Sequence, residues 1–453
     1  MIVLSYISVV LPFVLMIALG LLVPAIVVLS YSRLGAGLIV TLGIFMIDAL
    51  TLGDGRMSLG INIFYADIAL GLIALVAGLR LVFASDFPKK NGAWLLFCAL
   101  ICISLLTGLI SYGSTAGVQA RPYFYFMVAG LYAMSFEMTH ERLRLVFNAL
   151  TVTACLLIGL AIYRWVVYYT PIQSLLPPGG VYNVDGPIRV IYSNQALLIA
   201  QVLVAGFFFA TASSGFTVAR FLSPVLLGTT LVLQHRSVWL AALVGVLVRL
   251  LLGRSKSGSP LGQLLIVAGI VAATTIPLAF TEKLSGVTQQ IGASTTSALE
   301  GEGTTGERLR SWNEIIKNWY GAGARSIIIG QSFGTDNSRY VTDGRGAMHK
   351  IDYMAHNLFV QTLFNTGLLG LLAFLAATSY LIRELYRICR EGQGGVEAEV
   401  LLVLIAMQLA YYVPYGTDYL QSFLFGIALA YVAGKKARAG RTVEPRQEAG
   451  LLT

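Results

Sequence analysis

Charged side chains are scarce in this sequence. Aspartate, glutamate, lysine and arginine make up 12% of the 453 residues, whereas hydrophobic residues make up 57% and the mean hydropathy is +0.76. A water-soluble domain carries about 25% charged residues, which it needs to cover its surface. The composition therefore excludes a soluble globule and predicts an all-α polytopic membrane protein.

Cysteine and histidine are also rare, with four residues of each. All four cysteines lie within or beside apolar runs, where a thiol behaves as a small hydrophobic side chain. Cys98 and Cys102 have no histidine or carboxylate near them in the sequence, so we predict neither a disulfide nor a metal site. The aspartates of the expected outer loops show no pair with the close spacing of a divalent-metal motif. We expect no metal and no cofactor.

Acidic residues are fewer than basic ones, 22 against 31, and the formal net charge is +9. In a membrane protein this excess is interpreted by the side of the membrane on which it lies, so we expect no nucleic-acid partner. The cations concentrate in every second loop, which the positive-inside rule places in the cytoplasm. These residues are Arg33, Arg80, Lys89, Lys90, Arg142, Arg144, Arg220, Arg249, Arg254, Lys256, Arg383, Arg387, Arg390, Lys435, Lys436, Arg438 and Arg441.

Long apolar runs are abundant, and a helix that crosses a bilayer needs about 20 such residues. About 12 to 13 transmembrane helices are expected, from these runs: 2–29, 34–52, 61–83, 93–110, 123–136, 145–168, 193–212, 216–233, 238–252, 261–280, 358–381, 400–413 and 419–433. The first run is too long for a cleaved signal peptide, so we expect it to remain as a membrane anchor. With thirteen spans, the N-terminus lies outside and the C-terminal tail inside.

The runs divide the chain into four parts. We expect an N-terminal helix bundle at residues 1–280, a large outer loop at 281–355, C-terminal transmembrane helices at 356–434 and a basic cytoplasmic tail at 435–453. Within the loop, Trp312, Ile315, Ile316 and Trp319 recur at helical spacing, which predicts a helix lying on the membrane surface. The patch 327–329 resembles a strand.

The outer side holds isolated arginines and one well-placed histidine. Nearly every expected outer loop carries a single arginine, namely Arg56, Arg121, Arg189 and Arg236. His356 and Asn357 stand where the large loop gives way to an apolar run, and ionisable groups at such a position mark a functional site by default. Guanidinium groups bind phosphate oxygens in bidentate fashion and stay charged at any working pH. This pattern favours an anionic ligand such as a lipid diphosphate.

At this point the sequence resembles the O-antigen ligase and polymerase family. His356-Asn357 followed by the apolar stretch 358–372, with its Gly367-Leu-Leu-Gly370 step, is similar to that family's signature after the large periplasmic loop. The segment 234–241 resembles the family's arginine at the outer start of a helix. An arginine four residues before Trp312 resembles its loop motif, 330–334 is a loose form of its Gly-x-Gly step, and Arg189 with Asn194 matches an upstream pair more weakly. The resemblance covers roughly 189–370.

The resemblance implies a type-C glycosyltransferase fold that moves a glycan from undecaprenyl diphosphate to an acceptor hydroxyl at the periplasmic face, with inversion. By that resemblance, His356 is the general base that accepts the acceptor proton. Arg236 and Arg308 hold and neutralise the diphosphate leaving group. The remaining candidates for substrate binding are Arg121, Arg189, Arg310 and Asn357.

Structural explanations remain open for each residue. His356 could cap its helix or bond a loop carbonyl, and Arg236 could extend to a lipid phosphate as arginines at helix ends often do. Arg308 and Arg310 could simply face solvent or headgroups, although the spacing to Trp312 selects Arg308. His235 and His349 are taken as ordinary loop residues, and the tryptophan stripe is expected to seat its helix on the bilayer.

The partners that follow are a lipid-diphosphate-linked glycan donor, a glycolipid or lipid-linked glycan acceptor and membrane lipids. A ligase with lipid A core as acceptor is favoured by the single large outer loop, and a polymerase that joins lipid-linked repeat units is the alternative. A flippase for lipid-linked glycans would need charged or broken helices near the midplane and a pseudo-symmetric repeat. The expected location is the inner membrane of a bacterium, with the site facing the periplasm.

Overall fold

The computed structural model describes residues 22–52, 55–58, 62–84, 91–170, 172–176, 189–209, 217–252, 304–342, 348–392 and 394–441. Helices dominate these ranges, and two short antiparallel hairpins account for the strands among them. The expected all-α architecture is therefore confirmed. The expected spans 261–280 and most of 2–29 lie outside the described residues.

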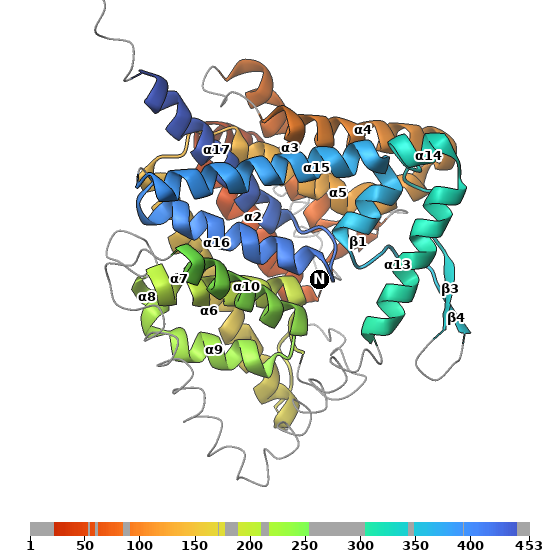
Figure 1. Ribbon diagram of the computed structural model, residues 1–453. Coiled ribbons are helices and arrows are strands. Elements are labelled where there is room, and N and C mark those ends of the chain that lie inside the picture. The colour runs from red at the N-terminus through yellow and green to blue at the C-terminus, as the bar shows by residue number, and fades with distance from the viewer. Residues whose placement is uncertain are drawn as a thin grey trace, which may run out of the picture.

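The elements follow one another with short connections (Figure 1). The N-terminal part contains α2 (Leu34–Thr51), β1 (Arg56–Ser58), β2 (Asn62–Phe64), α3 (Tyr65–Phe83), α4 (Gly92–Tyr112), α5 (Ser114–Met134) and α6 (His140–Tyr169). The middle part contains α7 (Ser193–Phe209), α8 (Thr217–Phe221), α9 (Ser223–Val232) and α10 (Arg236–Leu252). The C-terminal part contains α13 (Thr304–Gly321), α14 (Ala324–Ile329), β3 (Arg339–Thr342), β4 (Met348–Ile351), α15 (Leu358–Arg390), α16 (Gly395–Tyr412) and α17 (Tyr419–Arg441).

Six helices in the described part of the chain are long and apolar enough to cross a membrane, namely α2, α3, α4, α6, α15 and α16. Many of their large apolar side chains face outward, as in Ile110 of α4, which is 87% exposed. Outward apolar surface of this kind suits lipid and not water. The chain is a polytopic membrane protein.

Small residues let two central helices approach each other closely. Gly426 of α17 lies against the backbone of Gly130 in α5, and the Ser422 hydroxyl donates to the Phe126 carbonyl of α5. Close approach through small residues and buried hydroxyl bonds is how membrane helices associate without a hydrophobic driving force. α5 and α17 therefore form the inner pair of the bundle, while α4 packs along α15 (Figure 1).

Two of the expected continuous spans are broken. The run 216–233 divides into α8 and α9 at Leu222, because Pro224 favours the first turn of a new helix over the middle of an old one. The run 358–381 belongs to α15, which breaks at Gly367, where φ is 65° and ψ is −167°. Only glycine adopts that conformation readily.

α13, α14 and the β3–β4 hairpin gather at one end of the bundle, on the right of Figure 1. α13 confirms the predicted helix, but its tryptophan stripe does not face the bilayer as expected. Ile315 and Trp319 are buried against Ala355 and Phe364, and the Trp319 indole donates to the Ser326 carbonyl at 2.8 Å. That part of the prediction is wrong because another protein segment covers the stripe first.

The patch 327–329 is also different from its prediction, since it is helical and forms the end of α14. A short isoleucine run is compatible with strand or helix, and periodicity alone does not separate them. Here the left-handed glycines Gly323 and Gly330 bound the helix on either side. This short helix then packs against α15 at the Gly367 break.

The opposite end of the bundle carries ion pairs between helices. Glu384 of α15, 4% exposed, accepts from Arg387 at 2.9 Å and from Lys436 of α17 at 3.2 Å. Arg249 of α10 lies 3.8 Å from Glu399 of α16. These cations belong to the loops expected in the cytoplasm, so the two ends of the bundle differ in charge and in the structures they carry.

Candidate functional site

His356 lies in the short connection between β4 and α15, at the end of the bundle that holds α13. Two tyrosine rings flank its imidazole. The ring centroid of Tyr353 is 5.1 Å away, and that of Tyr415, from the turn between α16 and α17, is 6.3 Å away in an edge-on arrangement. The aromatic contacts hold the imidazole while the residue keeps an exposed edge.

The surroundings of His356 favour its neutral form. Loss of hydration lowers the pKa of the imidazole from its ordinary 6.5 to about 4, and repulsion from Arg308 and Arg339 adds to the effect. Water reaches the exposed edge and screens these repulsions, so the shift in solution is smaller in size but has the same direction. At neutral pH, His356 is therefore available as a proton acceptor.

Arg308 reaches the same place from α13. Its guanidinium group lies over the Tyr415 ring at 5.2 Å and donates to the Pro414 carbonyl at 3.1 Å. One aromatic ring thus contacts both the histidine and the arginine, and the guanidinium charge influences the imidazole pKa. The structure brings these two predicted residues together, although they are 48 positions apart in the sequence.

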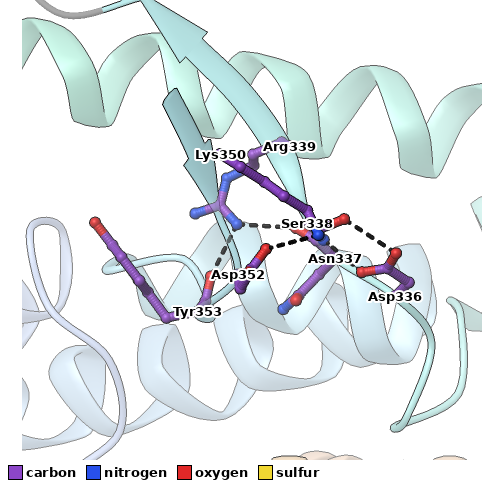
Figure 2. Close-up of polar contacts among 7 residues, drawn as sticks. All are labelled: Asp336, Asn337, Ser338, Arg339, Lys350, Asp352 and Tyr353. Atoms are coloured by element: carbon purple, nitrogen blue, oxygen red, sulfur yellow. Dashed lines mark hydrogen bonds and ion pairs between the residues drawn. The ribbon is translucent and has the colours of Figure 1, made fainter. Parts of the chain in front are cut away.

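Arg339 is a third cation near the imidazole, and it holds the surrounding segments together (Figure 2). Its guanidinium group is buried and donates to the Tyr353 carbonyl at 2.8 Å, to the Asn337 carbonyl at 2.9 Å and to the Ser311 hydroxyl of α13 at 2.6 Å. Arg339 therefore fixes α13 and the segment that leads to His356 relative to each other.

Arg189 and Arg236 form a second cationic pair. Arg189 donates to the Gln234 carbonyl at 3.3 Å, two residues before Arg236 begins α10. Between them, the buried His235 donates from Nε2 to the Ile191 carbonyl at 3.1 Å. Burial, and then the charge of Arg189, lower the pKa of His235 to about 4, so it stays neutral. His235, expected to be an ordinary loop residue, connects the Arg189 segment to α10.

The start of α10 lies at the same end of the bundle as His356. α10 and α16 run antiparallel, because Arg249 meets Glu399 at one end and Gly245 meets Met407 and Val403 further along. Continued in the same direction, Arg236 comes level with the end of α16, where Pro414 and Tyr415 follow. Both cationic pairs therefore flank the turn after α16.

The other predicted residues are placed as follows. Asn357 caps α15, since its side-chain oxygen accepts from the Val360 N–H at 2.9 Å. Arg310 is exposed on α13. Arg121 of α5 pairs with Asp67 of α3 at 2.9 Å and covers the Phe64 ring at 4.7 Å. A role in substrate binding stays a prediction for all three.

Sequence reasoning missed Arg339 and Tyr415. Arg339 is one of several arginines in the large outer loop, and no sequence pattern separates it from the exposed Arg325. Tyr415 belongs to a short turn, Pro414-Tyr415-Gly416, that the sequence marks only as a connection. The one available signal was an aromatic residue beside proline at the outer end of a helix.

A comparison with protein families gives one match over the end of the chain that holds this site. The family model described as O-antigen ligase matches residues 221–375. A search of curated proteins finds no match to this chain. The matched residues include Arg236, Arg308 and His356, and they overlap most of the range over which the sequence resembles that family. The predicted family is therefore confirmed, and residues 221–375 are an O-antigen ligase family segment within a multi-pass membrane protein.

Proposed function

We propose that this protein is a metal-independent, inverting glycosyltransferase that moves a glycan from undecaprenyl diphosphate to an acceptor hydroxyl. The family is one of glycosyltransferase-like ligases and polymerases, which supports the general reaction. The observation that carries the proposal is the imidazole of His356 with a lowered pKa, next to Arg308 on the shared Tyr415 ring. A neutral base beside a fixed cation suits an acceptor proton and an anionic leaving group.

In the proposed reaction, the acceptor hydroxyl loses its proton to His356 as its oxygen attacks the anomeric carbon. The bond between that carbon and the diphosphate oxygen breaks, and the electron pair leaves with the diphosphate. Arg308 and Arg236 neutralise the charge that develops on the leaving group. Attack from the face opposite to the diphosphate inverts the anomeric configuration. Arg189 and Arg310 supply further phosphate contacts in this scheme.

For the acceptor, we propose lipid A core, which makes the protein an O-antigen ligase. The large loop that covers the site supports this choice, because a bulky glycolipid acceptor needs a broad approach. A polymerase that uses a second lipid-linked repeat unit as acceptor has the same chemistry. We place the site on the periplasmic side of the inner membrane of a bacterium, since the opposite end of the bundle carries the cationic loops.

The proposal is tested by release of polyprenyl diphosphate from a polyprenyl-diphosphate glycan by the purified protein with a chelator present. Replacing His356 by alanine should lower kcat about 10²–10⁴-fold, the usual contribution of a placed base. His349→Ala is the matched control, because His349 is an exposed histidine on β4 of the same loop and should leave kcat unchanged.

Two results would contradict the proposal. Full activity in His356→Ala would remove the base, and a strict requirement for a divalent ion would remove the metal-independent mechanism. Supplying one donor with either lipid A core or a second repeat unit separates ligase from polymerase. Transport of the donor without release of diphosphate would indicate a flippase.

A further inference from the structure

A cavity of about 330 Å³ lies between the ends of α2, α3, α5 and α7 and is distinct from the surroundings of His356. Its wall combines three aromatic residues, one guanidinium group, one carboxylate and two side-chain amides. The lining residues are Asp48, Phe64, Ala66, Arg121, Tyr125, Tyr192, Asn194 and Gln195. Ligand cavities in proteins measure about 300–1,000 Å³, so this one has room for a small ligand.

The charges around this cavity disfavour an anion. Arg121 is the guanidinium in the wall, and it is already paired with Asp67 at 2.9 Å. The Tyr125 hydroxyl donates to the same carboxylate. Asp48 adds a second carboxylate, which faces the cavity. A phosphate placed here would meet one neutralised cation and a negative side chain, whereas Arg308 and the Arg189–Arg236 pair surround the turn after α16.

The polar groups of the wall retain hydrogen-bonding capacity for hydroxyl groups. Gln195 is fully buried, and its Oε1 accepts from the Tyr192 N–H at 2.9 Å, which identifies the other atom as Nε2. That Nε2 has no hydrogen-bond partner among the described residues. Leaving a buried donor unpaired costs about 1–3 kcal/mol, so a ligand acceptor at this place is favoured.

Asp48 offers the complementary group. Its Oδ2 accepts from the Tyr419 hydroxyl at 2.7 Å, and the carboxylate has further lone pairs for ligand hydroxyls. Phe64, Tyr125 and Tyr192 provide apolar faces beside these polar atoms. A donor, a carboxylate acceptor and aromatic faces together suit a saccharide ring, which has hydroxyl groups at its edge and C–H groups on its faces.

A chain of direct contacts links the cavity to His356. Ser193, between two lining residues of α7, hydrogen-bonds the Tyr411 hydroxyl at 2.8 Å. The Tyr411 ring stacks on Tyr415 with centroids 4.8 Å apart and planes 9° apart, and Tyr415 contacts the imidazole. The neighbouring Asn194 donates to Asp418 of the same turn at 2.7 Å. The cavity and the proposed catalytic base thus lie on either side of one aromatic turn.

We propose that this cavity binds an uncharged saccharide ring of the glycan substrate and discriminates against acidic sugars, with Asp48 and Gln195 as the selecting residues. This inference rests on the proposed function. The selectivity follows from charge, because the carboxylate of a hexuronate would approach Asp48 without a free cation to compensate for the repulsion. Arg121, predicted to contact phosphate or sugar, acts here on the sugar.

The test uses the full-length protein in detergent and matched pairs of methyl glycosides, glucoside with glucuronide and galactoside with galacturonide. Saturation-transfer NMR measures their binding. The neutral member of at least one pair should bind about tenfold more tightly than the acidic member, as expected for one like-charge contact in a partly screened site. Asp48→Asn should narrow that gap, and Gln195→Glu, which keeps the acceptor for Tyr192, should weaken the neutral ligand.

Asp352→Asn is the matched control, because Asp352 is an exposed carboxylate on the far side of the large loop that pairs with Lys350 (Figure 2). It should leave both affinities unchanged. Equal binding of neutral and acidic members, or an unchanged gap in Asp48→Asn, would overturn the inference. Folding of each variant is checked by its thermal unfolding midpoint.

The sugar could come from the donor or from the acceptor, and a second set of probes separates them. The same neutral sugars carried on farnesyl diphosphate should be weakened by Asp48→Asn if the donor sugar occupies the cavity, whereas only the free glycosides should be weakened if the acceptor does. Farnesyl diphosphate alone reports on Arg236 and Arg308. Loss of its binding in Arg236→Gln and Arg308→Gln supports the proposed function independently, so each proposal can fail without the other.

Discussion

At the scale of single residues, the site depends on how three side chains share one aromatic turn. Arg308 and His356 contact opposite parts of the Tyr415 ring, and the buried Arg339 holds the backbone of Tyr353 next to them. The guanidinium groups therefore affect His356 in two ways. They bind the anionic substrate in the proposed reaction, and they also make protonation of the imidazole unfavourable.

The lowered pKa of His356 predicts the pH dependence of kcat/KM, which reports on the free enzyme. The base form exists above the pKa and disappears as the pH falls through it. Because that pKa lies below 6.5, kcat/KM should stay constant from pH 8 to well below pH 6.5 and fall only in more acidic solution. Arg308→Gln removes a repelling charge, so it should raise the His356 pKa and move the acidic fall to higher pH.

Arg325→Gln provides the control, since it removes the same charge from an exposed position on the neighbouring α14. Its acidic fall should coincide with that of the parent protein. An acidic fall near pH 6.5 in the parent, or an unchanged profile in Arg308→Gln, would show that Arg308 does not control the protonation of the base.

The sequence indicated His356, Arg308 and Arg236 as a set, because their residue types and their order along the chain carry information. It did not indicate Arg339 or Tyr415, because the importance of these two depends on contacts between segments far apart in the chain. Ser311, Asn337 and Tyr353 surround the Arg339 guanidinium, and no local pattern predicts that arrangement.

At the scale of elements, the glycines of the sequence motif have a structural explanation. Gly330 follows α14 with φ 81°, and Gly367 breaks α15 with φ 65°. The backbones of the two glycines lie directly against each other, since a Cβ at Gly330 would meet the Thr366 and Gly367 nitrogens and one at Gly367 would meet the Ile328 carbonyl. The Gly-x-Gly step and the Gly367-Leu-Leu-Gly370 step are thus two sides of one helix contact.

Gly367→Ala should therefore destabilise the protein. A side chain in this left-handed conformation costs about 1–3 kcal/mol, and the added Cβ would also push against the Ile328 carbonyl. Thermal unfolding should occur at a lower temperature, and kcat should fall because α14 and α13 shift relative to α15. Differential scanning fluorimetry and the diphosphate-release assay measure the two effects.

Gly71→Ala is the comparison for this experiment. Gly71 lies inside α3, and a Cβ there meets no atom within 4 Å. Alanine is the better helix former by about 1 kcal/mol, so this variant should unfold at the same or a higher temperature. Equal unfolding temperatures for Gly367→Ala and the parent would mean that the break in α15 has no role in holding α14.

Element existence was predictable, but what each face touches was not. The helical spacing of Trp312, Ile315 and Trp319 predicts α13, and the structure has that helix. The same stripe fits lipid or protein equally well, because both are apolar. Its contact with Phe364 and Ala355 is decided by the fold of α15. The break at Gly367 is likewise set by the approach of α14 and leaves no local signal apart from the glycine.

At the scale of the whole molecule, hydropathy alone predicts most of the bundle. A lipid-facing helix must satisfy its own backbone hydrogen bonds, so a long apolar run has few structures available to it. For this reason the predicted runs that fall in the described ranges correspond to helices, with the breaks at Leu222 and Gly367 as the differences. The division of the chain into four parts, and the side of the membrane on which each end lies, stay predictions.

The two ends of the bundle provide the means to test that sidedness. One end carries α13, the hairpin and His356, whereas the other carries Glu384 with its cationic partners from α15 and α17. Cytoplasmic loops of membrane proteins are enriched in lysine and arginine, so the Glu384 end should face the cytoplasm. If it does, the proposed site opens on the opposite side, where lipid-linked glycans would be joined.

A thiol-labelling experiment decides the orientation. In a background with the four native cysteines replaced, Lys350→Cys at the site end and Arg438→Cys at the Glu384 end each place one exposed thiol. A membrane-impermeant maleimide added to right-side-out vesicles should modify Lys350→Cys at once and Arg438→Cys only after the membrane is opened. The reverse order would place His356 in the cytoplasm, and a periplasmic transfer reaction would then be impossible for this protein.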